Sequence, residues 1–324
     1  MILLKTPAFW YRQPNFLQNM LLRPLSWIYS QIAEGNYRKN YTHEYNKSQV
    51  IAIGGVTMGG SGKTVVVQKV CEILNGEKVA VLSRGFGRKS RQTFLVNPLM
   101  HSYEDVGDEP LLLSRSVPVY VGKDRAKSAE LAGNFDFLVL DDGITQRSLL
   151  PNVKLLVVDA EQRFGNGEMF PLGPNRLNIA WLKFNIDAAI VIGGDSRLAV
   201  AIPELDGIPL YHGTLQQDLS QLNRSRIVAF CGIGYPNKFF RSLEKHVDIV
   251  DRISFPDHYP FSTADIEKLL LLGDRLQAQI VTTEKDLVRI PRPYRDNIAT
   301  VPIKLIWSNH ATNLSLLLNP NKIP

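Results

Sequence analysis

Cysteine is scarce in this sequence, which contains only Cys71 and Cys231 among its 324 residues. Two cysteines cannot form the disulfide framework of a small secreted scaffold, and so low a number is typical of a reducing compartment. Long apolar runs are missing as well, because a stretch such as Phe137–Leu140 falls far short of the ~18 residues that a bilayer-spanning helix needs. The first residues also lack the ordered regions of a cleaved signal peptide. We therefore expect a cytoplasmic chain without a transmembrane helix.

The composition is that of a folded protein. Apolar residues make up 44% of the chain and charged residues 21%, which excludes a disordered or fibrous chain. At ~150 residues per domain, the length predicts about two domains. Lysine and arginine outnumber the acids by only 37 to 31, and we expect neither a nucleic-acid partner nor an obligate protein partner.

The first 50 residues differ from the rest in being both basic and aromatic. They hold six Lys or Arg against two Glu, a balance of +4. Apolar side chains recur there at roughly helical spacing, interrupted by Pro24, and they are Leu17, Leu21, Leu25, Trp27 and Ile28. Such a stripe fits a helix in the membrane interface and equally a helix packed on its own domain. The residues alone leave both interpretations of this amphipathic segment, 1–40, open.

From residue 49 onward, short apolar runs alternate with helical stretches. This alternation is typical of a parallel sheet with crossover helices. We predict an α/β domain with a mostly parallel sheet over 41–215. A polar bridge at 214–226 precedes a second alternating series, which predicts a smaller α/β domain over 216–324.

A phosphate-binding loop is the strongest motif. After the strand that begins at Gln49, the chain continues through a glycine-rich turn into a helix. Glycines let backbone N–H groups curl around phosphates, a lysine reaches the outer phosphates, and a threonine hydroxyl binds Mg²⁺. The usual pattern has glycine where this chain has Thr57. The motif predicts that the domain over 41–215 is of the P-loop NTPase type. The predicted ATP-binding residues are Thr57, Met58, Gly59, Gly60, Ser61, Gly62, Lys63 and Thr64.

Two acids at the end of another predicted strand complete the metal side of this site. Asp141 and Asp142 follow the apolar run Phe137–Leu140. Such carboxylates hold Mg²⁺ in P-loop enzymes, directly or through water, although Asp-Asp-Gly is also an ordinary turn. We predict a magnesium site at Thr64 with Asp141 or Asp142.

Two P-loop classes fit the sequence poorly. A GTPase needs Asn/Thr-Lys-x-Asp, and Thr283–Asp286 has one residue too many between threonine and lysine. The dimeric ATPases that position proteins on membranes carry a lysine where this chain has Met58.

Several segments together resemble one family, the tetraacyldisaccharide 4′-kinases of lipid A biosynthesis, in order and over nearly the whole chain. Besides the loop around Gly54–Thr64, they are Ser83–Gly87, Val106–Pro110, Asp141–Gly143, Phe170–Pro174, Gly232–Gly234, Phe255–Tyr259 and Val281–Asp286. Threonine at position 57 is normal for this family.

The resemblance implies an ATP-dependent kinase that phosphorylates the 4′-hydroxyl of a tetraacylated glucosamine disaccharide 1-phosphate. The product would be lipid IVA, made at the cytoplasmic face of the inner membrane, and the N-terminal segment would dock on that anionic surface. The competing hypothesis is a membrane-associated P-loop ATPase switch without a small-molecule acceptor.

The resemblance also assigns roles to residues. Asp108 matches the family's proposed catalytic carboxylate and His258 its paired histidine, whereas each by itself fits a helix cap or a turn. Lys63 would neutralise the transferred phosphoryl group. The anionic lipid also needs cations, and Arg84 and Arg125 are predicted to supply them, although each also fits a solvated surface arginine. Arg176 matches a family arginine that follows the Phe-Pro-x-Gly-Pro segment and is the third predicted cation.

This sequence departs from the family pattern at two places. Ile144-Thr145-Gln146 stands where Phe-Gln-His is usual, and Leu177 where glutamate is usual. A histidine and a carboxylate near the site are therefore missing.

Overall fold

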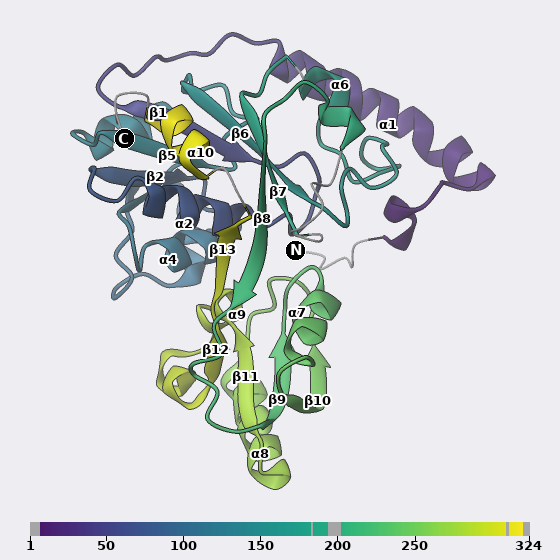
Figure 1. Cartoon of the computed structure of the whole chain (residues 1–324), viewed down its shortest axis with the longest axis vertical. Coiled ribbons are helices and arrows are strands. Elements are labelled where there is room, and N and C mark those ends of the chain that lie inside the picture. The colour runs from purple at the N-terminus through teal and green to yellow at the C-terminus, as the bar shows by residue number, and fades with distance from the viewer. Residues whose placement is uncertain (1–6, 183, 194–201, 309–310, 320–324) are drawn as a thin grey trace.

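The computed structural model describes residues 7–182, 184–193, 202–308 and 311–319. Two sheets organise these residues into a larger and a smaller unit (Figure 1). The predicted α/β class, with a mostly parallel sheet and a second, smaller α/β unit, is confirmed.

The larger unit contains a nine-stranded sheet in the order β13-β8-β7-β6-β1-β5-β2-β4-β3. Seven neighbouring strands are parallel, and the edge strands β3 and β13 are antiparallel to their neighbours. The strands are β1 (Gln49–Gly54), β2 (Val79–Ser83), β3 (Phe94–Leu95), β4 (Val119–Val121), β5 (Phe137–Asp141), β6 (Val153–Asp159), β7 (Ala188–Ile192), β8 (Leu210–Gln217) and β13 (Ile303–Trp307).

Helices cover both faces of this sheet, as crossover connections require. Side chains of α2 (Lys63–Ile73), α4 (Asp108–Leu113) and α10 (Ala311–Leu318) pack on one face. Those of α5 (Arg125–Ala132) and α6 (Ile179–Leu182) pack on the other. Shorter pieces are α3 (Tyr103–Val106) and the 3₁₀ helices η1 (Ala8–Tyr11) and η2 (Pro203–Leu205).

The smaller unit is a four-stranded parallel sheet in the order β10-β9-β11-β12. Its strands are β9 (Arg226–Cys231), β10 (Asp248–Ser254), β11 (Gln279–Thr283) and β12 (Ala299–Val301). The helical pieces are α7 (Pro236–Leu243), α8 (Thr263–Leu276), α9 (Glu284–Leu287) and η3 (Arg292–Asn297). The core on one face contains α7 and that on the other contains α8.

Strands β8 and β13 connect the two units. They form an antiparallel pair, with Ile303 opposite Gln217 and Trp307 opposite Gly213, and extend from the larger sheet toward the smaller one (Figure 1). Because β13 and α10 lie on the larger unit, the last residues of the predicted range 216–324 return to the first sheet.

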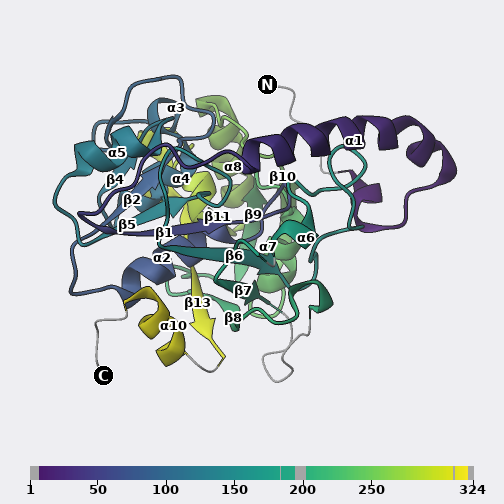
Figure 2. The same ribbon diagram turned by 90° about the horizontal axis from the view of Figure 1, so that it is seen from above.

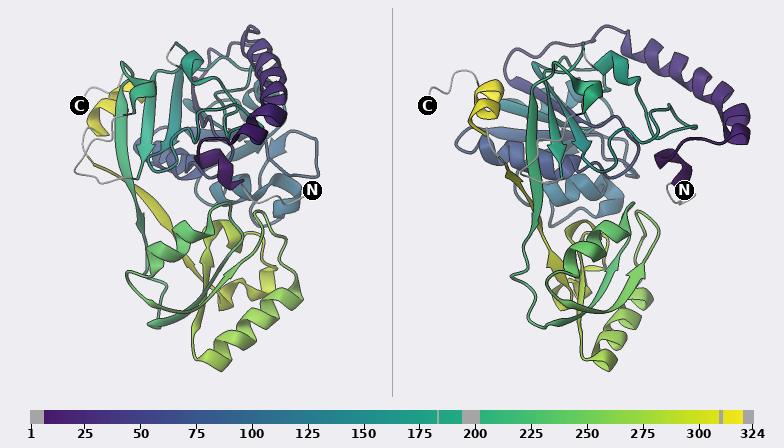
Figure 3. Two further views of the ribbon diagram at one scale, coloured as in Figure 1. Left: turned by 90° about the vertical axis from the view of Figure 1, so that its right-hand side faces the viewer. Right: turned by 45° about the vertical axis from the view of Figure 1, so that its right-hand side comes forward.

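The N-terminal helix α1 (Phe16–Tyr37) lies along the flank of the larger unit and reaches past its edge (Figures 2 and 3). A capping box begins it, in which Asn15 and Gln18 exchange side-chain-to-backbone hydrogen bonds, and the helix continues through Pro24, where the sequence suggested an interruption. One side is anchored, because Ser26 Oγ donates to the Met169 carbonyl over 2.8 Å.

The opposite side of α1 is apolar and exposed. The whole predicted stripe is at least 49% exposed, namely Leu17, Leu21, Leu25, Trp27 and Ile28. The stripe is therefore not packed inward as core. Among the described residues, no helix combines the length and hydropathy needed to cross a bilayer.

Candidate active site

The phosphate loop joins buried strand β1 to helix α2. Gly59 and Gly62 take φ angles of 115° and 83°, which favour glycine, and Gly62 caps α2 in the left-handed conformation. The loop is anchored from the side, because Met58 N–H donates to the Pro174 carbonyl over 2.8 Å. In general, the N–H groups of a helix's first turn and its positive dipole end attract anions. The geometry therefore matches the predicted phosphate loop.

Lys63 begins α2 beside the two strand-end carboxylates. Burial lowers the pKa of this lysine, and the charges of Asp142 and Asp141 act in the opposite direction. The Lys63 side chain therefore lies in a poorly solvated place next to the glycine-rich turn, where electrostatic attraction is stronger than in water.

Asp142 follows β5 and is held by Arg176. Two guanidinium nitrogens of Arg176 each donate to a different oxygen of Asp142 over 2.9 Å, and one of them also donates to the Gly55 carbonyl over 2.7 Å. Burial would raise the pKa of Asp142, but the hydrogen bonds from Arg176 and the charge of Lys63 outweigh it and hold the pKa below its usual range. Arg176, predicted to bind substrate, therefore ties a carboxylate to the phosphate loop.

Asp141 is the less paired of the two carboxylates. Its side chain is buried and accepts a hydrogen bond from Ser83 Oγ over 3.0 Å. Burial, with the nearby charges of Glu109 and Asp142, raises the pKa of Asp141 to about 6. A divalent cation would relieve this concentration of negative charge. Although the described residues contain no cluster of three acidic, histidine or cysteine ligands, Thr64, Asp141 and Asp142 offer the hard oxygen donors that Mg²⁺ takes.

The predicted substrate arginines differ in exposure. Arg125 is only 3% exposed and donates to the carbonyls of Gly122 and Asp141 over 2.6 and 3.2 Å. Burial is the main cause that lowers the pKa of Arg125 to about 10, and the charges of Asp141 and Asp142 act in the opposite direction. Arg84 is exposed. Arg125 is therefore buried beside the end of β5, whereas Arg84 is open to solvent.

Asp108 and His258 meet between the two units. Asp108 begins α4 after Gly107, whose φ is 96°, and it is buried. His258 comes from the loop after β10 and also has a positive φ, 58°; its Nδ1 lies 2.8 Å from Asp108 Oδ2. Such conformations cost energy in non-glycine residues and cluster at functional sites. A pair separated by 150 positions is thus assembled by the fold.

Further charged residues join the units around this pair. Lys285 Nζ lies 2.7 Å from Glu109 Oε1, and buried Arg289 lies 3.3 Å from Asp108. Lys238 also pairs with Asp159 across the units at 2.6 Å. These pairs were not predicted from the sequence, although Lys285 belongs to the motif segment Val281–Asp286.

Comparisons with known proteins identify the family. The family model for tetraacyldisaccharide-1-P 4′-kinase matches residues 18–320. A protein named tetraacyldisaccharide 4′-kinase from Rhodopseudomonas palustris (strain HaA2) is 37% identical over 298 residues, covering 89% of this chain and 87% of that protein. One of the same name from Rhodospirillum centenum is 37% identical over 98% of this chain and 96% of its own. The chain belongs to the tetraacyldisaccharide 4′-kinase family. The resemblance inferred from its motifs is confirmed.

The fold agrees with this membership. A crystal structure of LpxK from Aquifex aeolicus in complex with ATP superimposes with a TM-score of 0.74. It is 24% identical, over 94% of this chain and 99% of that one, and this likeness supports the fold.

The two departures from the family pattern lie in packed positions. Ile144 and Leu177 are each 1% exposed and belong to one apolar cluster. The side-chain amide of Gln146 forms hydrogen bonds within its own loop: it donates to the Leu149 carbonyl and accepts from the Leu149 N–H over 2.9 Å. In this kinase these positions therefore stabilise the loop after Asp142.

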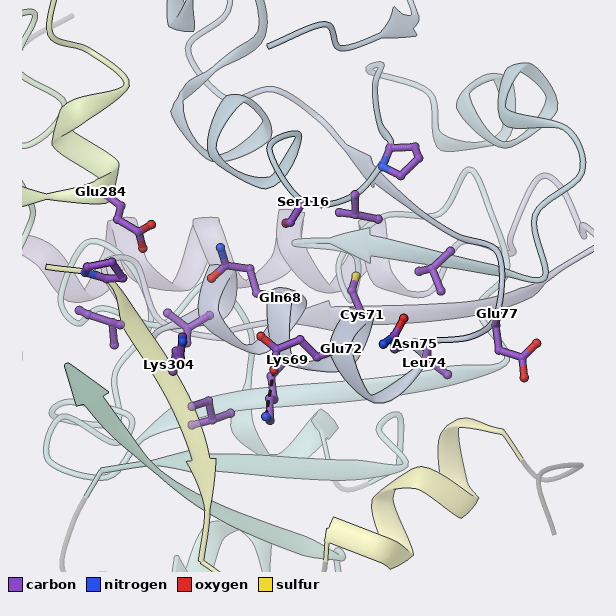
Figure 4. Close-up of a pocket in the computed structure, with 17 residues that line it drawn as sticks. Gln68, Lys69, Cys71, Glu72, Leu74, Asn75, Glu77, Ser116, Glu284 and Lys304 are labelled. Atoms are coloured by element: carbon purple, nitrogen blue, oxygen red, sulfur yellow. Dashed lines mark hydrogen bonds and ion pairs between the residues drawn. The ribbon is translucent and has the colours of Figure 1, made fainter. Parts of the chain in front are cut away.

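A cavity of about 510 Å³ lies apart from this site (Figure 4). It is formed by the side of α2 that carries Gln68 and Glu72, together with Glu284 and the start of β13. None of the residues predicted for the site lines it.

Asp141→Asn is expected to stabilise the metal-free protein at high pH. The pKa of Asp141 is about 6 in the folded protein and near 4 in the unfolded chain. The protonated carboxyl therefore contributes to stability below pH 4, and this contribution is lost as the pH rises through 6. Two pH units correspond to about 3 kcal/mol. Urea unfolding in EDTA should therefore show the variant more stable than wild type at pH 8 by up to about 3 kcal/mol, and at pH 4.5 by only about 1 kcal/mol.

The exposed Asp296 provides the control for this measurement. Asp296→Asn should leave the stability difference between the two pH values at its wild-type size. Equal stabilities of Asp141→Asn and wild type at pH 8 would contradict the raised pKa.

Proposed function

We propose that this chain transfers the γ-phosphoryl group of ATP to the 4′-hydroxyl of a tetraacyldisaccharide 1-phosphate, a lipid A precursor, giving lipid IVA. The observation that carries the proposal is that Lys63 of the phosphate loop lies within electrostatic reach of Asp141, Asp142 and Glu109, and that Glu109 is next to Asp108 of the Asp108–His258 pair, in a member of this kinase family. The family relatives bear the name of this activity, and the Aquifex protein was solved with ATP.

The phosphates of ATP would lie on the glycine-rich turn. Backbone N–H groups of residues 59–64 and the start of α2 hold them, and Lys63 neutralises the charge that develops on the transferred group. Arg176, tied to Asp142 and Gly55, fixes the strand-end carboxylate relative to this turn.

Thr64 and Asp141 are the residues that would hold Mg²⁺, with Asp142 as a further oxygen donor already engaged by Arg176. When bound, the ion supplies charge neutralisation at the outer phosphates. Asp141 suits this role because its buried carboxyl lacks a cationic hydrogen-bond partner among the described residues.

Asp108 would accept the proton of the sugar hydroxyl. A carboxylate oriented by an imidazole can act as a general base, and the His258 contact over 2.8 Å supplies that orientation. Because His258 lies in the smaller unit, chemistry depends on the two units being together. Arg84 is placed to meet the anionic lipid from solvent.

The exposed side of α1 would dock on the cytoplasmic face of the inner membrane, as a peripheral contact. Its apolar stripe and the basic balance of the first 50 residues match what an anionic interface attracts. In this proposal 1–40 docks, 41–215 carries the phosphate loop and 216–324 supplies His258, with β13 and α10 of that last range lying on the larger unit.

Leu21→Glu combined with Trp27→Glu tests this docking. The parent side chains are 58% and 64% exposed, so the fold should survive. Because each loses an apolar anchor and gains a charge repelled by anionic lipid, liposome binding in co-sedimentation should fall by more than 10-fold, and the apparent KM for micellar lipid should rise. Leu271→Glu, at a 68% exposed position on α8, is the control and should bind liposomes like wild type. Unchanged binding of the α1 variant would refute docking through α1.

Transfer itself is tested with labelled ATP, Mg²⁺ and tetraacyldisaccharide 1-phosphate in detergent micelles. Label should appear in the lipid. Release of phosphate without labelled lipid would favour the ATPase switch instead.

A further inference from the structure

Arg289 follows α9 in the smaller unit, and its side chain is entirely buried. One guanidinium nitrogen, Nη2, contacts Asp286 Oδ1 and donates to the Gly232 carbonyl over 2.9 Å. Nη1 donates to the Tyr259 carbonyl over 3.3 Å. The guanidinium group thus has a fixed orientation within its own unit.

Its main partner, Asp286, is fixed in turn. Thr283 Oγ1 donates to Asp286 Oδ2 over 2.6 Å, and Gly232 N–H donates to Oδ1 over 2.9 Å. These are residues of two motifs singled out from the sequence, Val281–Asp286 and Gly232–Gly234. Both motifs therefore converge on the support of Arg289.

The remaining polar group of Arg289 points out of this arrangement. Its Nε lies 3.3 Å from Asp108 Oδ2 in the larger unit, but it makes no hydrogen bond of good geometry to any described residue. A buried donor without a partner is costly. The contact with Asp286 does not explain why Nε is buried without a hydrogen bond. An interaction of Nε with the charge of Asp108 does explain it.

On the other side, Asp108 presents one oxygen to the smaller unit. Oδ2 faces both His258 Nδ1, at 2.8 Å, and Arg289 Nε. Its other oxygen, Oδ1, accepts no hydrogen bond from a side chain or backbone group in the described part of the chain. The carboxylate is therefore held by Oδ2 and leaves Oδ1 available.

We propose that Arg289 is a positioning residue that keeps Asp108 ionised and turned so that Oδ1 receives the proton of the sugar hydroxyl. The inference rests on the proposed function. In the step, the hydroxyl O–H bond breaks and its proton passes to Oδ1, the oxygen forms a bond to the γ-phosphorus, and the bond from that phosphorus to the β,γ-bridging oxygen breaks to release ADP. A neutral imidazole orients Oδ2 but adds no charge, whereas a guanidinium always does.

The other groups around Asp108 do not supply this charge. Lys285 of α9 is paired with Glu109 of α4 at 2.7 Å, and Asp257 lies 3.8 Å from the far nitrogen of His258. Burial raises the pKa of the Tyr103 hydroxyl, which comes from α3, and the nearby charge of Asp108 raises that pKa as well. Arg289 is thus the permanent cation in direct contact with Asp108 among the residues described.

Arg289→Met and Arg289→Lys test the role in the full-length protein, with ATP and tetraacyldisaccharide 1-phosphate across pH 5.5–9. Methionine removes the charge, so the acidic limb of its pH profile should move up by about 1 to 2 pH units, and kcat should fall by up to about 10-fold at pH 5.5, the acidic end of the range. The loss therefore shrinks at pH 9, and the KM for ATP stays within about twofold. Arg289→Lys keeps the positive charge, so the acidic limb of its pH profile should stay at the wild-type position.

The control is Arg292→Met, which also removes a cation that reaches the larger unit, because Arg292 donates to the His101 carbonyl over 3.2 Å. Arg292 is exposed and has no carboxylate partner among the described residues. Its kcat and pH profile should match those of wild type. A loss in Arg289→Met that is uniform over pH, or no loss, would overturn the proposal. Should Arg289→Met fail to fold, Arg289→Lys carries the test, because a displaced limb in that charged variant would overturn it. Absence of lipid labelling by wild type would instead overturn the proposed function.

Discussion

Lys63→Ala is expected to lower kcat for phosphoryl transfer by about 10²–10³-fold while the fold is retained. The lysine begins α2 next to the glycine-rich turn, in a place where burial and two carboxylates act on its pKa. Removing one preorganised cation from a site of developing phosphoryl charge has this order of effect. Initial rates with labelled ATP, together with circular dichroism, measure the two quantities.

Lys69→Ala is the matched control, because this lysine lies on the same helix and lines the separate cavity (Figure 4). Lys69 pairs with Glu72 at 2.9 Å, and removal of the Lys69 side chain should leave kcat within about twofold of the wild-type value. Near-normal transfer by a folded Lys63→Ala protein would show that another group neutralises the transferred phosphoryl.

The local parts of this site are the ones that the sequence predicted best. The turn at Gly59–Gly62 is specified by residues that tolerate positive φ, followed directly by the helix that binds phosphate. The strand ending in Asp141 and Asp142 is likewise visible as an apolar run followed by acids. Each feature depends on neighbours within about ten positions, so a linear pattern carries it.

Pairings over long separations could not be predicted in this way. Arg176 and Asp142 are 34 positions apart and Asp108 and His258 are 150 apart, and only the fold brings them together. The pairing of Asp108 with His258 came from the family resemblance. Arg176 was matched to an arginine of the family, but nothing in its neighbourhood indicated that Asp142 would engage it.

The edges of the fold were missed for a related reason. Strand β8 overlaps the polar bridge at 214–226, and β13 alternates between buried and exposed residues without a long apolar run. Their stability comes from pairing with each other and, for β8, with β7. A strand whose hydrogen-bonding partner lies about 90 residues away gives little local signal.

Asp108→Ala and His258→Ala are each expected to lower kcat by about 10²–10⁴-fold, the contribution of a positioned general base. ATP binding should survive in both, because the phosphate loop and Asp141 are untouched. Saturation kinetics in lipid and fluorescence titration with ATP separate the two effects. The variants Asp108→Asn and His258→Gln, which preserve size, exclude loss of packing as the cause when they show the same loss.

The double variant decides whether the two residues act as one unit. His258 Nδ1 contacts the same oxygen that faces Arg289, so the imidazole has its effect through Asp108. Once Asp108 is gone, removing His258 should cost little more, and the double variant should lie within a few-fold of the worse single one. Losses that multiply would instead give His258 a role of its own at the substrate. Wild-type turnover in Asp108→Ala would move the proton acceptor to another carboxylate, for which Glu109, already paired with Lys285, and Asp141 are the nearest choices.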